Sequence, residues 1–216
     1  MARSRSAEFA IQRDTIVRTA ARLFARDGYP ATSMSGLAEA CGISKPLLYH
    51  YVNDKYQLLT EITDGHVSRL VALVDEVAAD AATHRWAPQQ HLRQLITRFV
   101  EEYALARDDH GVLTQDVKFL GEADRARVLG KERQVVEAFA HCIVAARADW
   151  QPADAATLAK PLTMLLFGMM NWLFTWLRPD GPLGHHEMAP VVADLFLGGL
   201  PGVELPADVI ERCRTA

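Results

Sequence analysis

Apolar positions recur along most of this chain with the spacing of an α-helix. Between residues 8 and 27, Ile16, Ala20 and Phe24 mark one face, while arginines occupy another. Gly28 ends that pattern, because glycine readily adopts the conformation that follows a helix. Alternating apolar runs bounded by turn residues, which would indicate strands, do not occur. The pattern therefore predicts an all-α fold.

Capping residues and glycine or proline breaks divide the chain into about nine predicted helices. They cover residues 8–27, 34–41, 46–51, 55–82, 88–107, 112–120, 122–148, 153–177 and 185–198. Residues 108–111 are expected to form a loop between two of these helices. A tail containing glycine and proline follows the last one.

The second and third predicted helices are short and separated by a four-residue link, as in a helix-turn-helix. Gly42 permits a sharp turn, and Ile43 supplies a small apolar contact between the two helices. The outer face of the third helix carries polar and aromatic groups, and the helices on either side begin where their dipoles favour a phosphate. These positions give the candidate DNA-binding residues: Ser33, Ser44, Lys45, Tyr49, His50 and Lys55.

Charge is distributed unevenly along the chain. Residues 1–60 hold eight Lys and Arg against five Asp and Glu, whereas the remaining residues hold fifteen against twenty-two. A basic head on an acidic body indicates that only the head meets a polyanion. Arg3 and Arg5 are expected in an arm ahead of the first helix, a type of segment that can reach into a DNA groove.

Residues 8–60 resemble the N-terminal DNA-binding domain of TetR-family transcriptional regulators. The resemblance is carried by Gly28-Tyr29, by the stretch from Ala31 to Tyr51 and by Asn53-Asp-Lys-Tyr-Gln-Leu-Leu59. Three positions depart from the usual family pattern: Gly36, Val52 and Tyr56. The resemblance implies that the six candidate residues touch double-stranded DNA, and that a homodimer presents two recognition helices to a roughly palindromic operator.

The same resemblance implies two domains. A helix-turn-helix domain would occupy residues 1–54, with a connecting helix from Lys55, and residues 55–216 would form a larger helical ligand-binding and dimerisation domain. The helices at 153–177 and 185–198 are similar to the pair that forms a four-helix bundle across a dimer axis. The candidate interface residues are Leu165, Gly168, Met169, Trp172 and Trp176, with packing inside the monomer core as the alternative.

The segments 171–183 and 193–200, together with 118–125 and 131–133, are similar to members of the family that sense acyl-CoA thioesters. An apolar pocket with cations at its mouth would suit such a ligand. The candidate pocket residues are Phe99, Tyr103, Phe119, Phe139, Met164 and Phe167, and the candidate phosphate-binding residues are Arg125, Arg127, Lys131 and Arg133. The alternatives are ordinary core packing for each aromatic residue and a solvated helix face for each cation.

Other kinds of site find little support. The three cysteines, Cys41, Cys142 and Cys213, lack metal-ligand spacing, so neither a disulfide framework nor a metal site is expected, and a reducing, cytoplasmic setting fits best. The longest apolar run, Leu162 to Leu177, is short for a membrane span and contains Asn171. No phosphate loop or nucleophile motif appears, so neither an enzyme nor a cofactor is expected.

These features together predict a DNA-binding transcriptional regulator. Its expected role is to repress a catabolic operon until a small hydrophobic effector, such as an acyl-CoA thioester, releases it. Two alternatives stay open at this point. One is a regulator of efflux or stress genes that senses a hydrophobic drug-like ligand. The other, from a different class, is a DNA-packaging protein that acts without a ligand.

Overall fold

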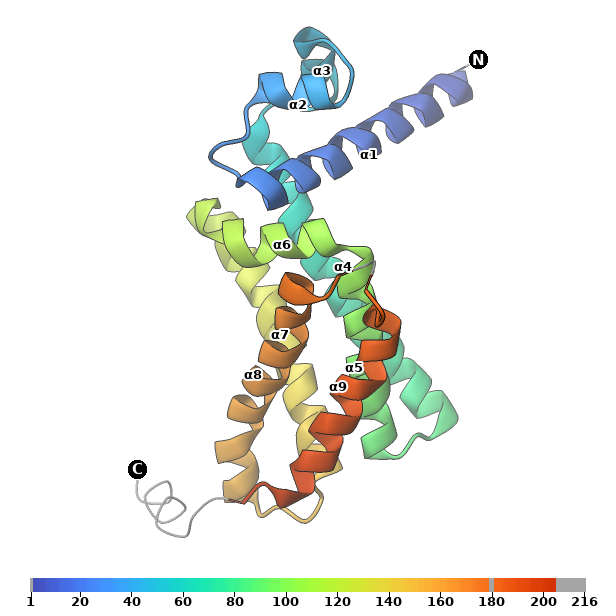
Figure 1. The fold of residues 1–216 in the computed structure, drawn as a ribbon, viewed down its shortest axis with the longest axis vertical. Helices are drawn as coiled ribbons and strands as arrows, with labels where there is room; N and C mark the ends of the chain where they lie inside the picture. Colours follow the sequence, from blue (N-terminus) through green and yellow to red (C-terminus); the bar gives the residue numbers. More distant parts are fainter. Residues whose placement is uncertain (1, 179–180, 205–216) are drawn as a thin grey trace. The chain divides into compact units, whose positions relative to one another are not determined.

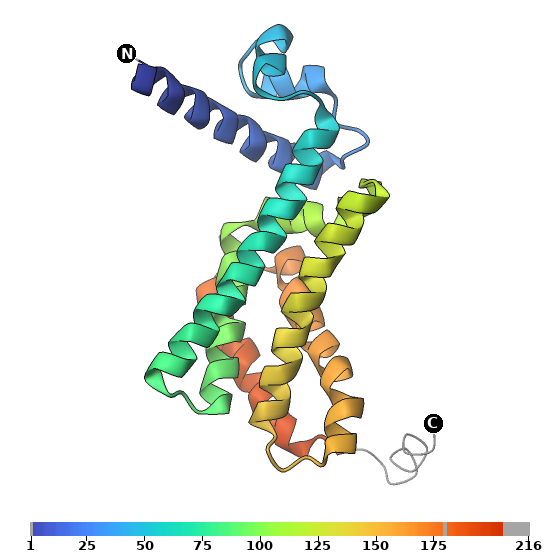
Figure 2. The same ribbon diagram turned by 180° about the vertical axis from the view of Figure 1, so that it is seen from behind.

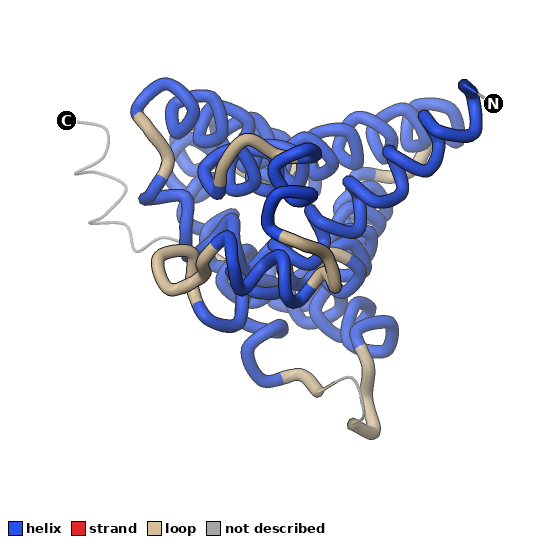
Figure 3. Tube along the Cα trace, turned by 90° about the horizontal axis from the view of Figure 1, so that it is seen from above, coloured by secondary structure: helices blue, strands red, loops and turns tan. Residues whose placement is uncertain are grey.

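The computed structural model describes residues 2–178 and 181–204, with side chains from Ala7 onward. Within those ranges the chain forms nine α-helices, two short 3-10 helices and no strand, which confirms the predicted all-α fold (Figure 1). Cys213, the end of the tail, and Pro179 and Asp180 of the segment 171–183 lie outside the described residues. Short loops join the helices (Figure 3).

The helices follow one another in the order anticipated from the apolar pattern. Their bounds are α1 Ala2–Asp27, α2 Met34–Ala40, α3 Lys45–Tyr51, α4 Lys55–His84, α5 Pro88–Leu105, α6 Arg107–Asp116, η1 Val117–Phe119, α7 Glu122–Ala146, α8 Pro152–Trp176, α9 His185–Gly199 and η2 Leu200–Gly202. Figure 2 shows α4 as one uninterrupted helix.

Two predicted boundaries were wrong. Helix α1 begins at Ala2 rather than at residue 8, so Arg3 and Arg5 belong to the helix and not to an arm. Nothing in residues 2–7 breaks a helix, and alanine and arginine favour one. Residues 108–111, expected as a loop, lie inside α6, and the chain departs from helical geometry at Ala106 instead. Gly111 is buried there, and a Cβ built on it would lie 3.5 Å from that of Ala25.

The described chain divides into two compact units. The N-terminal unit comprises residues 1–69 and 106–130, and the C-terminal unit comprises residues 70–105 and 131–216. The first three helices therefore pack with the start of α4, with α6 and with the start of α7. The domain boundary predicted from the sequence, between residues 54 and 55, does not coincide with the boundary of these units. It concerns function and stays a prediction.

The N-terminal unit is built on one apolar core. Helix α1 packs against α2 and along α6, and α2 packs against α3. The fully or nearly fully buried members of this core include Ile16, Phe24, Leu37, Leu48, Leu58, Leu59, Val112, Leu113 and Val128. Burial of large apolar side chains of this kind stabilises a fold by about 1.5–3 kcal/mol each. This core fixes the place of α3, because Leu48 anchors that helix from its inner side.

The C-terminal unit has a separate apolar core, in which α5 packs against both α8 and α9. Three phenylalanine rings lie near its centre: Phe99 from α5, Phe139 from α7 and Phe167 from α8. At the end of α9, the guanidinium of Arg147 donates to the carbonyl oxygens of Leu200 and Val203. These bonds satisfy carbonyl groups that the end of a helix leaves without helical partners.

Candidate functional site

Helix α3 is held by its N-cap and by one buried leucine, and its outer face is exposed to solvent. Ser44 is its N-cap, and the Ser44 hydroxyl oxygen accepts the backbone N–H of Leu47 at 3.4 Å. Leu48 is 0% exposed in the core, whereas Lys45 and His50 are exposed and Tyr49 is 47% exposed. The structure therefore brings these three candidate DNA-binding residues together on one short, outward-facing helix.

The turn before α3 has the geometry that its sequence predicted. Ser33 caps α2, because its hydroxyl oxygen accepts the backbone N–H of Gly36 at 3.0 Å. Gly42 has a φ of 66°, a conformation that glycine adopts without the strain a Cβ would cause, and Ile43 packs half-buried against the core. The hydroxyl oxygens of Ser33 and Ser44 accept the capping hydrogen bonds. Each hydroxyl group also has one O–H donor, which can bond to an acceptor such as a phosphate oxygen.

Lys55 has a role that the sequence did not indicate. Its ammonium group donates to the carbonyl oxygens of Tyr29 at 2.7 Å, Thr32 at 2.8 Å and Pro30 at 3.3 Å. It also lies 4.3 Å from the centroid of the Tyr29 ring. An ammonium group has three N–H donors, so these carbonyls use all of them. The side chain holds the loop between α1 and α2, and Lys55 differs in this respect from the other five candidates.

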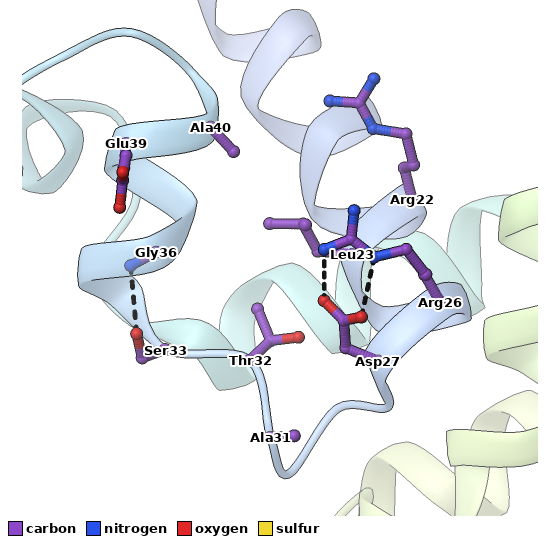
Figure 4. A pocket seen from close by; sticks show the side chains of 10 residues that line it. All are labelled: Arg22, Leu23, Arg26, Asp27, Ala31, Thr32, Ser33, Gly36, Glu39 and Ala40. Carbon is purple, nitrogen blue, oxygen red and sulfur yellow. Dashed lines mark hydrogen bonds and ion pairs between the residues drawn. The ribbon is translucent and has the colours of Figure 1, made fainter.

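A groove of about 580 Å³ lies between α1 and α2 (Figure 4). Ser33 stands on one side of it, and on the other the Arg26 guanidinium donates to both carboxylate oxygens of Asp27, at 2.7 and 2.6 Å. That pairing lowers the pKa of Asp27 below its usual range. Because Asp27 and Glu39 offset Arg22 and Arg26, the lining of the groove carries no net charge.

Two further residues belong to this site and were not predicted from the sequence, Phe9 on α1 and Leu47 on α3. The Phe9 ring contacts the rings of His50 and Tyr51, with centroid separations of 5.7 and 4.7 Å. Phe9 lies seven residues before Ile16, so the helical period could have placed it on the inward face of α1. Leu47 is 41% exposed beside the buried Leu48. No local signal marked Leu47, because two consecutive leucines of a helix can both be buried, as Leu58 and Leu59 are.

Four of the six candidate pocket residues meet in the core of the C-terminal unit. The Phe99 ring centroid lies 4.7 Å from that of Phe139 and 5.9 Å from that of Tyr103, and the Phe139 and Phe167 centroids are 4.9 Å apart. Burial, with a smaller contribution from the charge of Glu132, raises the pKa of Tyr103. Burial also raises the pKa of Glu132. These two groups give the aromatic cluster a polar side.

The other candidate effector residues are placed differently. Phe119 belongs to the N-terminal unit, where its ring lies 5.6 Å from that of Tyr29. Met164 belongs to the C-terminal unit but is exposed on α8. Arg125 and Arg127 lie in the N-terminal unit.

Arg127 forms ion pairs with Asp64 at 3.0 Å and with Asp124 at 2.7 Å. Lys131 and Arg133 lie on the part of α7 that belongs to the C-terminal unit, where Arg133 is exposed. They are the two candidate cations that share a unit with the aromatic cluster.

Helix α8 carries an exposed apolar strip along one face. Of the five candidate interface residues, Leu165, Gly168, Trp172 and Trp176 are exposed, with Trp172 at 66%, whereas Met169 packs half-buried against the core. Val191 and Leu195 are exposed in the same way on α9. Large apolar side chains gathered on a surface indicate an interaction site. The four exposed residues are therefore not part of the monomer core.

Metal sites and membrane spans are other possible features of an all-α chain. Among the described residues, no group of three or more His, Cys, Asp or Glu side chains is placed to hold a metal ion. Within the same ranges, no helix has the length and apolar character needed to cross a membrane.

A short recognition helix held outward by a capped turn and a buried leucine defines a helix-turn-helix domain of the DNA-binding kind. A family model described as bacterial regulatory proteins of the tetR family matches residues 16–62. A second, described as the tetracyclin repressor-like C-terminal domain, matches residues 85–200, which is over half of the chain.

Known proteins resemble the chain over nearly its whole length. It is 28% identical over 210 residues to the HTH-type transcriptional regulator AcrR of Shigella flexneri, covering 91% of this chain and 94% of that protein. A TetR-family regulator from Bordetella parapertussis 12822 is 34% identical, with a TM-score of 0.80 and coverage of 90% and 98%. AibR, solved in complex with isovaleryl coenzyme A and operator DNA, has the same fold, with a TM-score of 0.71, 24% identity and coverage of 85% and 97%. The chain belongs to the TetR family of DNA-binding transcriptional regulators.

Proposed function

We propose that the chain is a homodimeric repressor that binds a roughly palindromic operator through α3 and leaves it when a small hydrophobic effector binds the C-terminal unit. The observation that carries the DNA-binding part is the outer face of α3, held outward by the Ser44 cap and by the buried Leu48. Lys45 and His50 would donate to guanine acceptors, and Tyr49 would contact a phosphate or a thymine methyl. A DNA partner makes the cytoplasm the proposed location.

The exposed strip on α8, together with Leu195 on α9, supports the proposed dimer. A two-fold axis places the same patch of each subunit against its copy, so one apolar strip is enough to form an interface. Trp172 and Leu165 would be buried there, along with Trp176, and Gly168 would let the helices approach closely. The separation of the two α3 helices in this dimer would have to match the 34–36 Å repeat of the major groove.

An acyl-CoA thioester is the proposed effector. The cluster of Phe99, Phe139 and Phe167 would take an acyl group, and Lys131 and Arg133 would meet the phosphates of coenzyme A. The fold shared with AibR, which was solved with an acyl-CoA and with operator DNA, is consistent with this assignment. Release then requires that the effector prefer a dimer whose recognition helices are spaced incorrectly for the operator.

The second candidate is a regulator of efflux or stress genes that senses a hydrophobic drug-like compound. The aromatic cluster supports it as well, because apolar and aromatic side chains would also suit a hydrophobic compound without a coenzyme A portion. The two candidates differ in whether the coenzyme A portion contributes to binding.

One titration decides between these effectors. An operator selected from random duplexes by the wild-type protein is followed by fluorescence anisotropy while acyl-CoA thioesters, the free acids, coenzyme A and a panel of hydrophobic drugs are added. Release by a thioester at concentrations where its free acid and coenzyme A do nothing would support the acyl-CoA proposal. Release only by drugs would replace it with the second candidate, and equal binding to all duplexes would favour a packaging protein. Chromatographic recovery of the intact thioester would show that the chain does not hydrolyse it.

A further inference from the structure

Leu47 is an exception among the leucines of the N-terminal unit. Its side chain is 41% exposed, whereas every other leucine in the described part of that unit is buried or half-buried. It also lies outside the apolar core and outside the set of partly buried residues that pack against that core. Burial in the monomer core therefore does not account for a leucine at this position.

The exposure of Leu47 shows the direction in which it points. It lies about 100° around α3 from the buried Leu48, and its 41% exposed side chain faces away from the core. The Leu47 N–H is bound by the Ser44 hydroxyl, which holds it in the first turn of α3. That turn is the part of a recognition helix that comes closest to base edges in a helix-turn-helix complex.

The chemistry of leucine limits what it can contact there. It has no hydrogen-bonding atom, so it can contribute only apolar contact with the DNA. The apolar group that bases present in the major groove is the 5-methyl group of thymine. Lys45 and His50, exposed on the same short helix, supply the hydrogen-bond donors that such a contact lacks.

We propose that Leu47 reads the 5-methyl group of one thymine in each operator half-site. The proposal rests on the proposed function, because it requires α3 to enter the major groove. It adds that one base pair of the half-site is recognised by apolar contact rather than by a hydrogen bond. At that pair the protein would distinguish thymine from uracil, which differs from it only by the methyl group.

The test removes the methyl group and the leucine separately. Wild-type protein first selects its operator from random duplexes, and each thymine of one half-site is then replaced singly by uracil. Dissociation constants are measured by fluorescence anisotropy for the wild-type protein and for Leu47→Ala. At one position, uracil should weaken wild-type binding about three- to tenfold, the range expected for removing one buried methyl from a good contact. Leu47→Ala should bind the thymine and uracil duplexes equally.

Two controls separate recognition from folding. Leu105→Ala removes an exposed leucine from the C-terminal unit and should retain the preference for thymine at that position, and thermal melting should show that Leu47→Ala is as stable as the wild type. A uracil effect of the same size in Leu47→Ala and the wild type at every position would overturn the proposal, as would selected half-sites without thymine. Failure of the wild-type protein to select any duplex would instead reject the proposed function itself.

Discussion

The ammonium group of Lys55 lies 2.7 Å from the carbonyl oxygen of Tyr29 and 4.3 Å from the centroid of that residue's ring. The backbone N–H of Tyr29 in turn donates to Asp116 at 3.2 Å. The loop between α1 and α2 is therefore held from α4 on one side and from α6 on the other. Since this loop leads into the Ser33 cap, its position determines where α2 begins.

Replacement of Lys55 by methionine should destabilise the protein by about 2 kcal/mol, because hydrogen bonds from a charged group each contribute more than neutral ones. Operator affinity should also fall, since the loop before Ser33 is no longer held. The decisive measurement is the dependence of affinity on salt concentration. A lysine that contacts a phosphate contributes about 0.9 to the slope of log K against log salt.

Because the carbonyls of residues 29, 30 and 32 use all three donors of Lys55, the slope for Lys55→Met should equal that of the wild type. Lys45→Met provides the matched comparison, because Lys45 is exposed on α3. A reduced slope for Lys55→Met would show that the ammonium group leaves the loop to bind DNA.

The contact of Phe9 with His50 and Tyr51 predicts that a residue near the start of the chain affects recognition. Phe9→Ala should weaken operator binding about three- to tenfold, since aromatic pairs contribute about 0.5–1.5 kcal/mol beyond their buried area. The reason is that His50 loses the ring that limits its orientation. Anisotropy titrations with the selected operator would measure the loss.

Ile11→Ala is the control for this change. Ile11 lies on the same helix as Phe9 and is more exposed, at 67% against 38%. Equal effects of the two substitutions would mean that the N-terminal part of α1 acts as a whole and not through the Phe9 ring.

Local chemistry explains which parts of this site the sequence could predict. A serine that caps a helix bonds to a backbone group three residues ahead, so Ser33 and Ser44 were identifiable from neighbouring residues alone. The partners of Lys55 lie 23 to 26 residues before it, and Phe9 lies 41 residues before His50. Contacts of this kind exist only once the helices have packed, so no local pattern shows them.

The candidate effector residues show a second limit. Phe99, Phe119 and Met164 were candidates to line one apolar pocket. Of these three, Phe99 lies in the aromatic cluster, Phe119 belongs to the N-terminal unit and Met164 is exposed. An apolar residue on a helix can face its own core, another unit or a partner subunit, and composition does not distinguish these. Gly111 shows the same limit for boundaries, because a glycine that suggests a loop can equally lie in a packed helix.

The exposed strip on α8 predicts that a single charge will separate the proposed dimer. Trp172→Glu places a carboxylate on a side chain that is 66% exposed in the monomer and would be buried in the dimer. Because the interface is two-fold symmetric, it would contain one such carboxylate from each subunit. A large aromatic residue at an interface commonly contributes at least about 2 kcal/mol to binding, and the substitution removes it. The variant should be a monomer at micromolar concentration, as measured by light scattering coupled to size-exclusion chromatography.

Leu105→Glu is the matched control, because Leu105 is 85% exposed on α5 and belongs to the same unit. It should leave the dimer intact and keep full operator affinity. A dimeric mass for Trp172→Glu, or a monomeric mass for the wild type, would contradict the proposed interface.

A buried histidine pair predicts how stability depends on pH. The Nε2 atom of His66 lies 3.2 Å from Nδ1 of His110, and both side chains are buried. Burial, and then the charges of His110 and Arg69, lower the pKa of His66 to about 3. In the unfolded chain the same group would titrate near its ordinary pKa of about 6.5. Between pH of about 3 and 6.5, His66 is therefore protonated in the unfolded state and neutral in the folded state.

Stability from this group is fully present above the unfolded pKa and is lost as pH falls toward the folded one. The loss at pH 5 should be roughly 2 kcal/mol relative to neutral pH, measured by urea unfolding at constant protein concentration. Glutamine cannot take up the proton, so the free energy of unfolding of His66→Gln should fall by roughly 2 kcal/mol less than that of the wild type between pH 7.5 and pH 5. His141→Gln, at an exposed position, should lose as much stability as the wild type. If His66→Gln lost stability in parallel with the wild type over this range, the burial of a neutral His66 could not be the cause.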